Sequence, residues 1–169
     1  MRRGVRLGVD VGSVRVGLAV CDPDGVLASA VATLARDAQG ADLAEIARQS
    51  AERGVLEVVV GHPLSMNGQE GRAAGLARGY AVSLARLLAP VPVRLVDERL
   101  STVAAHQQLH GAGVRGRKHR SVVDQVAAVV VLQSALNVER TSGREPGSLV
   151  EPGPEAEGPS PSAQEARPG

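Results

Sequence analysis

The stretch from Arg6 to Val20 constrains the fold more than any other part of the sequence. Two runs of apolar and β-branched residues meet there at Gly12-Ser13, which is the pattern of a β-hairpin. One carboxylate, Asp10, interrupts the first run. Burying a charged side chain in a strand costs free energy unless the group is paired, hydrogen-bonded or bound to a metal. Asp10 is therefore the first candidate for a functional residue.

The rest of the sequence predicts short apolar strands that alternate with helices. Gly12 is expected to give the first turn its backbone freedom, and Asp22-Pro-Asp-Gly25 predicts a second turn. Together these elements predict an α/β fold with one five-stranded mixed sheet, antiparallel in its first three strands and parallel afterwards, with helices on its faces. The predicted elements, in chain order, are strands 6–11, 14–21 and 26–34, helix 38–53, strand 56–60, helix 71–88, strand 93–96, a helix capped at 100–102 that ends near 110, and helix 122–138.

Composition divides the chain into a folded domain, residues 1–140, and a tail, residues 141–169. The tail has six prolines, five glycines and few large apolar residues, with two basic and five acidic side chains. Such a composition cannot support a packed core and predicts a disordered acidic tail. The domain keeps 17 basic and 13 acidic side chains, a mildly basic balance that is compatible with a polyanionic partner.

Residue usage argues against several classes of protein. Cys21 is the only cysteine, so the chain has no internal disulfide, and no zinc-binding spacing of Cys and His is present. No segment approaches about 18 uninterrupted apolar residues and the N-terminus is typical of a strand, so a cytoplasmic location without a membrane partner is expected. Tyr80 is the only aromatic residue. Without a platform for stacking bases, recognition of structured or duplex nucleic acid through its backbone is expected.

Acidic residues recur at the ends of later apolar runs. Asp97 and Glu98 follow the last predicted strand, where open α/β sheets place their sites, and Asp124 lies in the first turn of the last predicted helix. Glu98 is 88 residues after Asp10, and Asp124 follows 26 residues later, so only the fold can bring these acids together. If they converge, they form an oxygen-only site suited to Mg²⁺ or Mn²⁺ and to phosphodiester hydrolysis.

Each acid also has a plain structural explanation. Asp10 could accept a salt bridge from Arg15 or Arg99, and the later acids could be ordinary residues at a strand end or at the positive end of a helix. The combination favours the functional interpretation, because all three acids would otherwise have to interrupt apolar runs by chance.

Basic and polar residues near these acids are candidate contacts for a nucleic-acid substrate. Four positive side chains lie within six residues, in a segment over 111–120 that is predicted to be a basic loop. Such a cluster could bind the phosphate backbone, although a solvated loop explains it equally well. The candidate substrate contacts are Arg15, Asn67, Gln69, Arg72, Arg99, Arg115, Arg117, Lys118 and Arg120.

Four blocks of the sequence resemble, in the same order, the blocks of the YqgF (RuvX) family. They are DVGSVRVGLA from Asp10, VVGHPLSMNG from Val59, DERLST from Asp97 and DQVAA from Asp124. The resemblance covers residues 5–138. It implies a ribonuclease H-like fold and a metal-dependent nuclease that matures the 5′ end of pre-16S rRNA. RNA and ribosomal particles are then the expected partners.

The resemblance also implies residue roles. Asp10, Glu98 and Asp124 match the family's acidic positions, which makes them the expected catalytic and metal-binding residues. Val14 and His62 depart from the family pattern, which usually has a basic residue and a leucine at these positions. His62 could hold a phosphate or move a proton, but a structural substitution is the favoured explanation.

Other functions remain open on the sequence. Resolution of four-way DNA junctions uses equivalent chemistry but needs a dimer, and the sequence does not specify a dimer interface. A non-catalytic nucleic-acid-binding factor in ribosome assembly would keep the basic cluster and give the acids no catalytic role. An actin-like sugar kinase also carries Asp-x-Gly-Ser on its first hairpin, but it needs a second similar domain that 140 ordered residues cannot supply.

Overall fold

The structure is a computed structural model that describes residues 1–100 and 116–152, without the side chains of residues 100 and 116–124. The elements within these ranges, in chain order, are β1 (Arg6–Val11), β2 (Arg15–Cys21), β3 (Ala28–Ala35), α1 (Ala41–Arg53), β4 (Glu57–His62), α2 (Arg72–Leu88), β5 (Val93–Asp97), the 3₁₀ helix η1 (Glu98–Leu100), α4 (Gly116–Ser142) and β6 (Ser148–Leu149).

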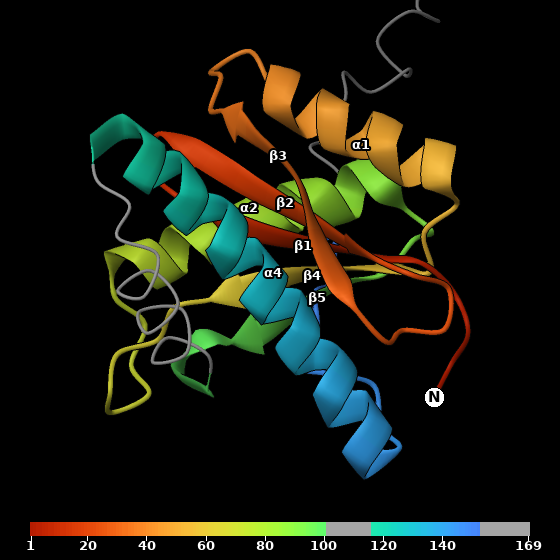
Figure 1. Cartoon of the computed structure of the whole chain (residues 1–169). Coiled ribbons are helices and arrows are strands. Elements are labelled where there is room, and N and C mark those ends of the chain that lie inside the picture. The colour runs from red at the N-terminus through yellow and green to blue at the C-terminus, as the bar shows by residue number, and fades with distance from the viewer. Residues whose placement is uncertain (101–115, 153–169) are drawn as a thin grey trace, which may run out of the picture.

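The strands form one mixed sheet in the order β3-β2-β1-β4-β5-β6. β1, β2 and β3 are an antiparallel meander, and β4 and β5 run parallel to β1, as the sequence predicts. Figure 1 shows α4 crossing one face of the sheet, whereas α1 and α2 lie against the other. Because each helix that follows a strand starts beside the strand's carboxyl end, α1 and α2 begin at the same edge of the sheet.

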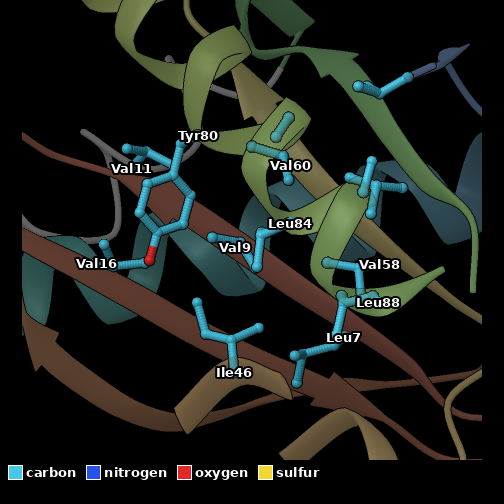
Figure 2. Close-up of a cluster of buried hydrophobic side chains, with 14 of the residues drawn as sticks. Leu7, Val9, Val11, Val16, Ile46, Val58, Val60, Tyr80, Leu84 and Leu88 are labelled. Atoms are coloured by element: carbon cyan, nitrogen blue, oxygen red, sulfur yellow. The ribbon is translucent and has the colours of Figure 1, made fainter. Parts of the chain in front are cut away.

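The larger core lies between the sheet and helices α1 and α2. Figure 2 shows its aliphatic side chains around the single aromatic ring, Tyr80. The Tyr80 hydroxyl donates a hydrogen bond of 2.8 Å to Asp42, which satisfies both buried polar groups. Burial, followed by the Asp42 carboxylate, raises the pKa of Tyr80 well above its usual range, so the hydroxyl stays protonated as a donor.

The residues of β1 alternate between the two faces of the sheet. Leu7, Val9 and Val11 pack into the core with α1 and α2. Gly8 faces α4 so closely that a Cβ atom at this position would lie 2.7 Å from the Cβ of Leu132. Because side chains alternate along a strand, Asp10 is placed on the same face as Gly8, toward α4.

Gly12 is required in the first hairpin for space rather than for an unusual backbone conformation. Its φ is not in the left-handed region, contrary to the expectation from sequence. Its N–H donates to the carbonyl of Arg15 at 2.8 Å, and a Cβ would lie 2.8 Å from the same oxygen. In the second turn, Gly25 does adopt a positive φ of 67°.

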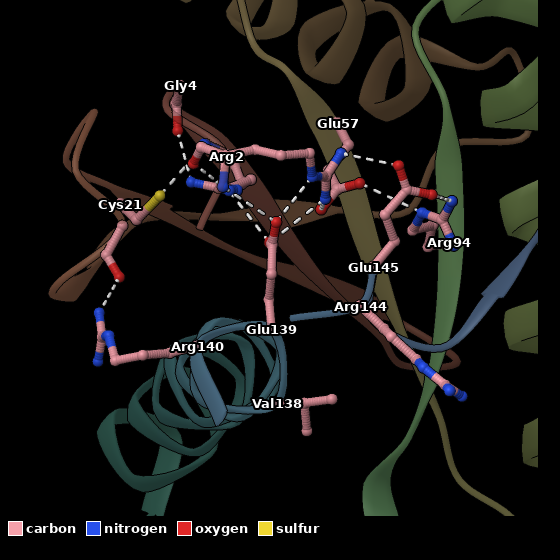
Figure 3. Close-up of polar contacts among 12 residues, drawn as sticks. Arg2, Gly4, Cys21, Glu57, Arg94, Val138, Glu139, Arg140, Arg144 and Glu145 are labelled. Carbon is pink, nitrogen blue, oxygen red and sulfur yellow. Dashed lines mark hydrogen bonds and ion pairs between the residues drawn. The ribbon is translucent and has the colours of Figure 1, made fainter. Parts of the chain in front are cut away.

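A network of buried ion pairs joins α4 to the amino ends of the strands (Figure 3). Glu139 on α4 lies 2.7 Å from Arg2 and 3.1 Å from Arg6. Glu57 at the start of β4 lies 2.9 Å from Arg2 and 3.2 Å from Arg94. Only about 1% of the surface of Arg6 and Glu57 is exposed. Removing one partner from such a network is costly because the other charge stays buried.

We expect Glu139→Gln to flatten the dependence of stability on acid pH. Burial alone would raise the pKa of Glu139, but hydrogen bonds and charge from Arg2, with Arg6, lower it below 4.5. A carboxylate with a lowered folded-state pKa stabilises the fold above its unfolded pKa, and this stability is lost as pH falls through the folded pKa. The variant should be less stable at pH 7 by about 1–3 kcal/mol.

Urea unfolding from pH 7 to pH 3 measures this effect. The difference between the wild type and Glu139→Gln should shrink below about pH 4.5, the ordinary value for the group. Glu52→Gln is the matched control, since Glu52 pairs with Arg48 on the exposed surface of α1. A difference that stays constant across this pH range would contradict the assignment.

The last helix begins earlier than the sequence predicts. α4 starts at Gly116 rather than at residue 122, so residues 116–120 are helical and the predicted basic loop is wrong there. Ser121 has the character of an N-cap, but Arg and Lys are good helix formers and let the helix extend upstream of it. The backbones of Arg117, Lys118 and Arg120 therefore lie on α4.

The ordered body also extends past the predicted boundary at residue 141, and the sheet has a sixth strand. α4 ends at Ser142, and β6 pairs antiparallel with β5, opposing Leu149 to Arg94. Val150 is buried and its N–H donates to the carbonyl of Val93 at 2.8 Å. This segment lacks a core of its own and takes its hydrogen bonds from the edge of β5, which composition does not reveal. The rest of the predicted tail, and the helix predicted near 102–110, lie outside the described residues.

Within residues 1–100 and 116–152, no helix is both long enough and apolar enough to cross a bilayer.

Candidate active site

The carboxyl ends of β1, β4 and β5 meet at one edge of the sheet. Val9 on β1 is opposite Val60 on β4, and His62 on β4 is opposite Asp97 on β5. Asp10 therefore lies next to the end of β4, and Glu98 directly follows the end of β5. The parallel register thus brings two acids that are 88 residues apart in the sequence to the same place.

Asp10 and Glu98 are in direct contact through a side-chain hydrogen bond. Both are half-buried. Burial raises the pKa of Glu98 above its ordinary value, with the charge of Asp97 acting the same way, whereas the bond with Asp10 and the nearby His62 act against this rise. Two carboxylates at hydrogen-bond distance repel each other when both are charged, unless a proton or a cation lies between them.

Gly61 makes room for Glu98. A Cβ atom on residue 61 would overlap Glu98 Oε1 and lie 2.9 Å from its Cδ. The carboxylate of Glu98 is thus packed directly over the backbone of β4, beside Asp10. The sequence carries no signal for this role, because a glycine before His-Pro indicates a turn and gives no sign of which side chain approaches it.

Arg99 binds Asp97 instead of Asp10. Its Nε lies 2.8 Å from Asp97 Oδ2, its Nη2 lies 2.5 Å from the same oxygen, and its backbone N–H donates to Oδ1 at 2.9 Å. The hydrogen bond from Arg99 lowers the pKa of Asp97 and keeps it charged. The predicted alternative of an Asp10–Arg99 salt bridge is therefore wrong. Arg99 also lies beside Gly68 of the loop before α2, where a Cβ would be 3.4 Å from Nη1.

The loop before α2 is held by its own polar side chains. The Ser65 hydroxyl and the Gln69 N–H both donate to Asn67 Oδ1. Asn67, a predicted substrate contact, thus uses its carbonyl oxygen to shape the loop that touches Arg99. Arg15, another predicted contact, is half-buried at the first position of β2, on the edge that carries Asp10.

His62 lies among acidic side chains. Its Nε2 is 3.5 Å from Glu70 Oε1, and its charge would also act on Asp97 and Glu98. Arg78 on α2 lies 3.0 Å from the other oxygen of Glu70. Glu70 thus links the end of β4 to α2 through His62 and Arg78.

Several predicted site residues lie outside the described residues. These are Arg115 as a whole and the side chains of Asp124, Arg117, Lys118 and Arg120. The backbone of Asp124 lies on α4, one helical turn before Ala128, whose carbonyl oxygen faces Gly8 on β1. Among the side chains that the structure does describe, no group of three or more His, Cys, Asp or Glu residues is arranged to hold a metal.

The comparisons with known proteins identify the family. The model of the RuvX family, described as Holliday junction resolvase, matches residues 4–138. The chain belongs to the RuvX family. Two relatives of this RuvX chain, from Kineococcus radiotolerans and Streptomyces coelicolor, are 60% identical over 151 residues and 54% identical over 152 residues. The alignments cover 89% of this chain in both cases, and 80% and 90% of the relatives. Both relatives carry the provisional name pre-16S rRNA nuclease.

Solved structures confirm the fold. Thermus thermophilus RuvC in complex with a Holliday junction substrate aligns with this RuvX chain at a TM-score of 0.58 and 17% identity, over 84% of this chain and 99% of RuvC. A second structure of the same RuvC gives a TM-score of 0.53 and 18% identity, over the same shares of the two chains. At this identity the likeness establishes the fold alone, which is the predicted ribonuclease H-like fold.

Proposed function

We propose that this RuvX protein is a metal-dependent nuclease that cleaves precursor 16S rRNA in the cytoplasm. The observation that carries the proposal is the contact between Asp10 and Glu98 at the carboxyl edge of the sheet. When two half-buried carboxylates are charged and in contact, they repel each other, and a divalent cation bound between them would relieve this repulsion. The relatives' shared name supports pre-16S rRNA as the substrate.

The donor set fits Mg²⁺ or Mn²⁺. Asp10 and Glu98 offer only hard oxygen ligands, which these ions prefer, and Asp124 is the proposed third ligand. When bound, such an ion generates a nucleophile from water and stabilises negative charge on the phosphate. Asp10 and Glu98 must both be deprotonated to bind it, and Gly61 gives the Glu98 carboxylate its position.

Arg99 and Arg15 are further proposed substrate contacts, and both lie at the edge of the sheet that carries Asp10. Asp97 fixes the Arg99 guanidinium in a bidentate pair beside the loop of Asn67, where it can face a phosphate. Arg15 is the proposed contact on β2. From the sequence, we also propose Arg115, Arg117, Lys118 and Arg120 as contacts.

A second candidate function is resolution of four-way DNA junctions. The description of the family model favours it, and the hydrolytic chemistry is the same. Junction resolution needs two sites acting on paired strands, hence a dimer, whereas rRNA cleavage works in either oligomeric state. Measuring the mass of the protein in solution shows whether it forms the dimer that junction resolution needs.

A substrate panel tests the proposed function. The purified chain is incubated with a structured RNA that spans the 5′ end of mature 16S rRNA, and with a four-way DNA junction, in Mg²⁺, Mn²⁺ or a chelator. We expect metal-dependent cleavage of the RNA and none with the chelator. Symmetric cleavage of the junction alone would assign resolvase activity. Binding of the RNA without cleavage in either metal would favour a non-catalytic assembly factor.

A further inference from the structure

A cavity of about 910 Å³ opens on the side of β1 opposite to Asp10. It is lined by residues 11–13 of the first hairpin, residues 36–38 after β3 and the first turns of α2. Its size falls within the usual range of about 300–1,000 Å³ for sites that take small ligands. The Asp10–Glu98 contact does not use this cavity.

Arg36 supplies a fixed positive charge to the cavity. Its guanidinium carbon lies 5.1 Å from the centre of the Tyr80 ring, and its Nη1 donates to the carbonyl of Gly12 at 3.3 Å. These contacts hold the charge in place but do not neutralise it, since neither partner is a carboxylate.

Arg72 supplies a second positive charge at the start of α2. Its side chain is exposed and forms no hydrogen bond or ion pair with any other residue in the described ranges. The N-cap, Gly71, provides no side-chain hydrogen bond, and the first turn contains no acidic residue. This first turn lines the cavity, and the free N–H groups at the start of a helix favour an anion.

One carboxylate lines the same cavity. Asp37 accepts the N–H of Ala41 at 3.0 Å and thereby caps the start of α1. The two guanidinium groups outnumber it, so the lining keeps a net positive charge. Val11 and Leu76 add an apolar surface.

We propose that this cavity, the Arg36–Arg72 pocket, binds a phosphate of the substrate strand close to the scissile bond. Asp10 and Val11 are consecutive and point to opposite faces of β1, so a strand that passes over the hairpin can reach both places. The charges would contact the phosphate and the apolar wall would contact the sugar. This inference rests on the proposed nuclease function and adds a binding site for the flanking part of its substrate.

Binding measurements test the pocket without depending on cleavage. The full chain is titrated into fluorescent structured RNA, in a chelator, at several salt concentrations. We expect Arg72→Ala to weaken binding about fivefold to tenfold and to reduce the salt slope by about 0.7–0.9, the value for one lost phosphate contact. Arg53→Ala is the matched control, because Arg53 is in the last turn of α1 at the opposite end of the sheet.

A second variant separates binding from folding. Ala73 is exposed in the first turn of α2, where a carboxylate stabilises a helix. Ala73→Glu should therefore keep or raise the melting temperature while weakening RNA binding at least as much as Arg72→Ala. RNA binding that is unchanged in both variants would overturn the pocket and leave the nuclease proposal standing.

A free nucleotide is the alternative source of the phosphate. One result would show that the assignment to the substrate strand is wrong. In it, a 5′-mononucleotide raises the melting temperature of the wild type but not of Arg72→Ala, while both proteins bind RNA equally well. Loss of RNA binding in Arg72→Ala with no effect of the mononucleotide supports it. If the wild type binds RNA through the pocket but never cleaves it, the proposed nuclease function is wrong, whereas the proposed binding pocket is still supported.

Discussion

Asp10→Asn is expected to lower metal-dependent RNA cleavage by about 10²–10³-fold or more, the usual loss when one charge-stabilising group is removed from an active site. Asparagine keeps the size of the side chain but lacks the negative charge that a divalent cation needs. The rate of cleavage of the structured RNA in Mn²⁺ measures the effect.

Stability distinguishes this loss from unfolding. Because Asp10 contacts Glu98, removing one of the two charges relieves repulsion, so the melting temperature should stay the same or rise. Asp24→Asn is the control, since Asp24 is an exposed acid that pairs with Arg3 at 3.0 Å. Equal cleavage by the wild type and Asp10→Asn would remove the basis of the nuclease proposal.

Gly61→Ala is expected to reduce cleavage by about 10–10²-fold with little loss of stability, since small misplacements of catalytic groups carry costs of this size. The new methyl group would occupy the space of the Glu98 carboxylate and push it away from Asp10. The displaced group is the end of a flexible side chain, so the free energy of unfolding should change by less than about 1 kcal/mol.

Two further variants sharpen this prediction. Gly79→Ala on α2 is the matched control, because a Cβ there meets no atom within 4 Å, and it should leave cleavage unchanged. Glu98→Asp shortens the side chain that the new methyl group displaces. The double variant Gly61→Ala/Glu98→Asp should therefore lose less cleavage activity than the product of the losses in the two single variants. Additive losses would indicate that Gly61 acts on something other than Glu98.

The sequence predicted the strands of the mixed sheet, with the first three antiparallel and the next two parallel, because apolar runs and turn signals are local patterns. Alternation in β1 and the continuous apolar runs of β4 and β5 specify the strands, and parallel strands bring Asp10 and Glu98 to one edge. The start of α4 was predicted six residues late because Ser121 has the character of an N-cap. β6 was missed because Ser148 and Leu149 pair with an existing edge instead of contributing to a core.

The remaining features depend on contacts between distant segments. Arg36 gave no signal in the sequence, because its place in the pocket depends on Tyr80 and Gly12 rather than on its neighbours. Gly61 likewise matters only through the side chain that packs over it. The same holds for Glu139, whose partners Arg2 and Arg6 are more than 130 residues away in the sequence.

The ion-pair network around Glu139 and Glu57 determines where a tag or linker can be attached to the protein. Arg2 is tied into it at the amino ends of the strands, whereas Asp10 lies four residues beyond Arg6, or about 13 Å farther along β1. A tag, a fluorophore or a surface linker attached before residue 1 therefore lies away from the edge of the sheet that carries Asp10. Immobilisation at this terminus should leave that edge accessible to a large binding partner.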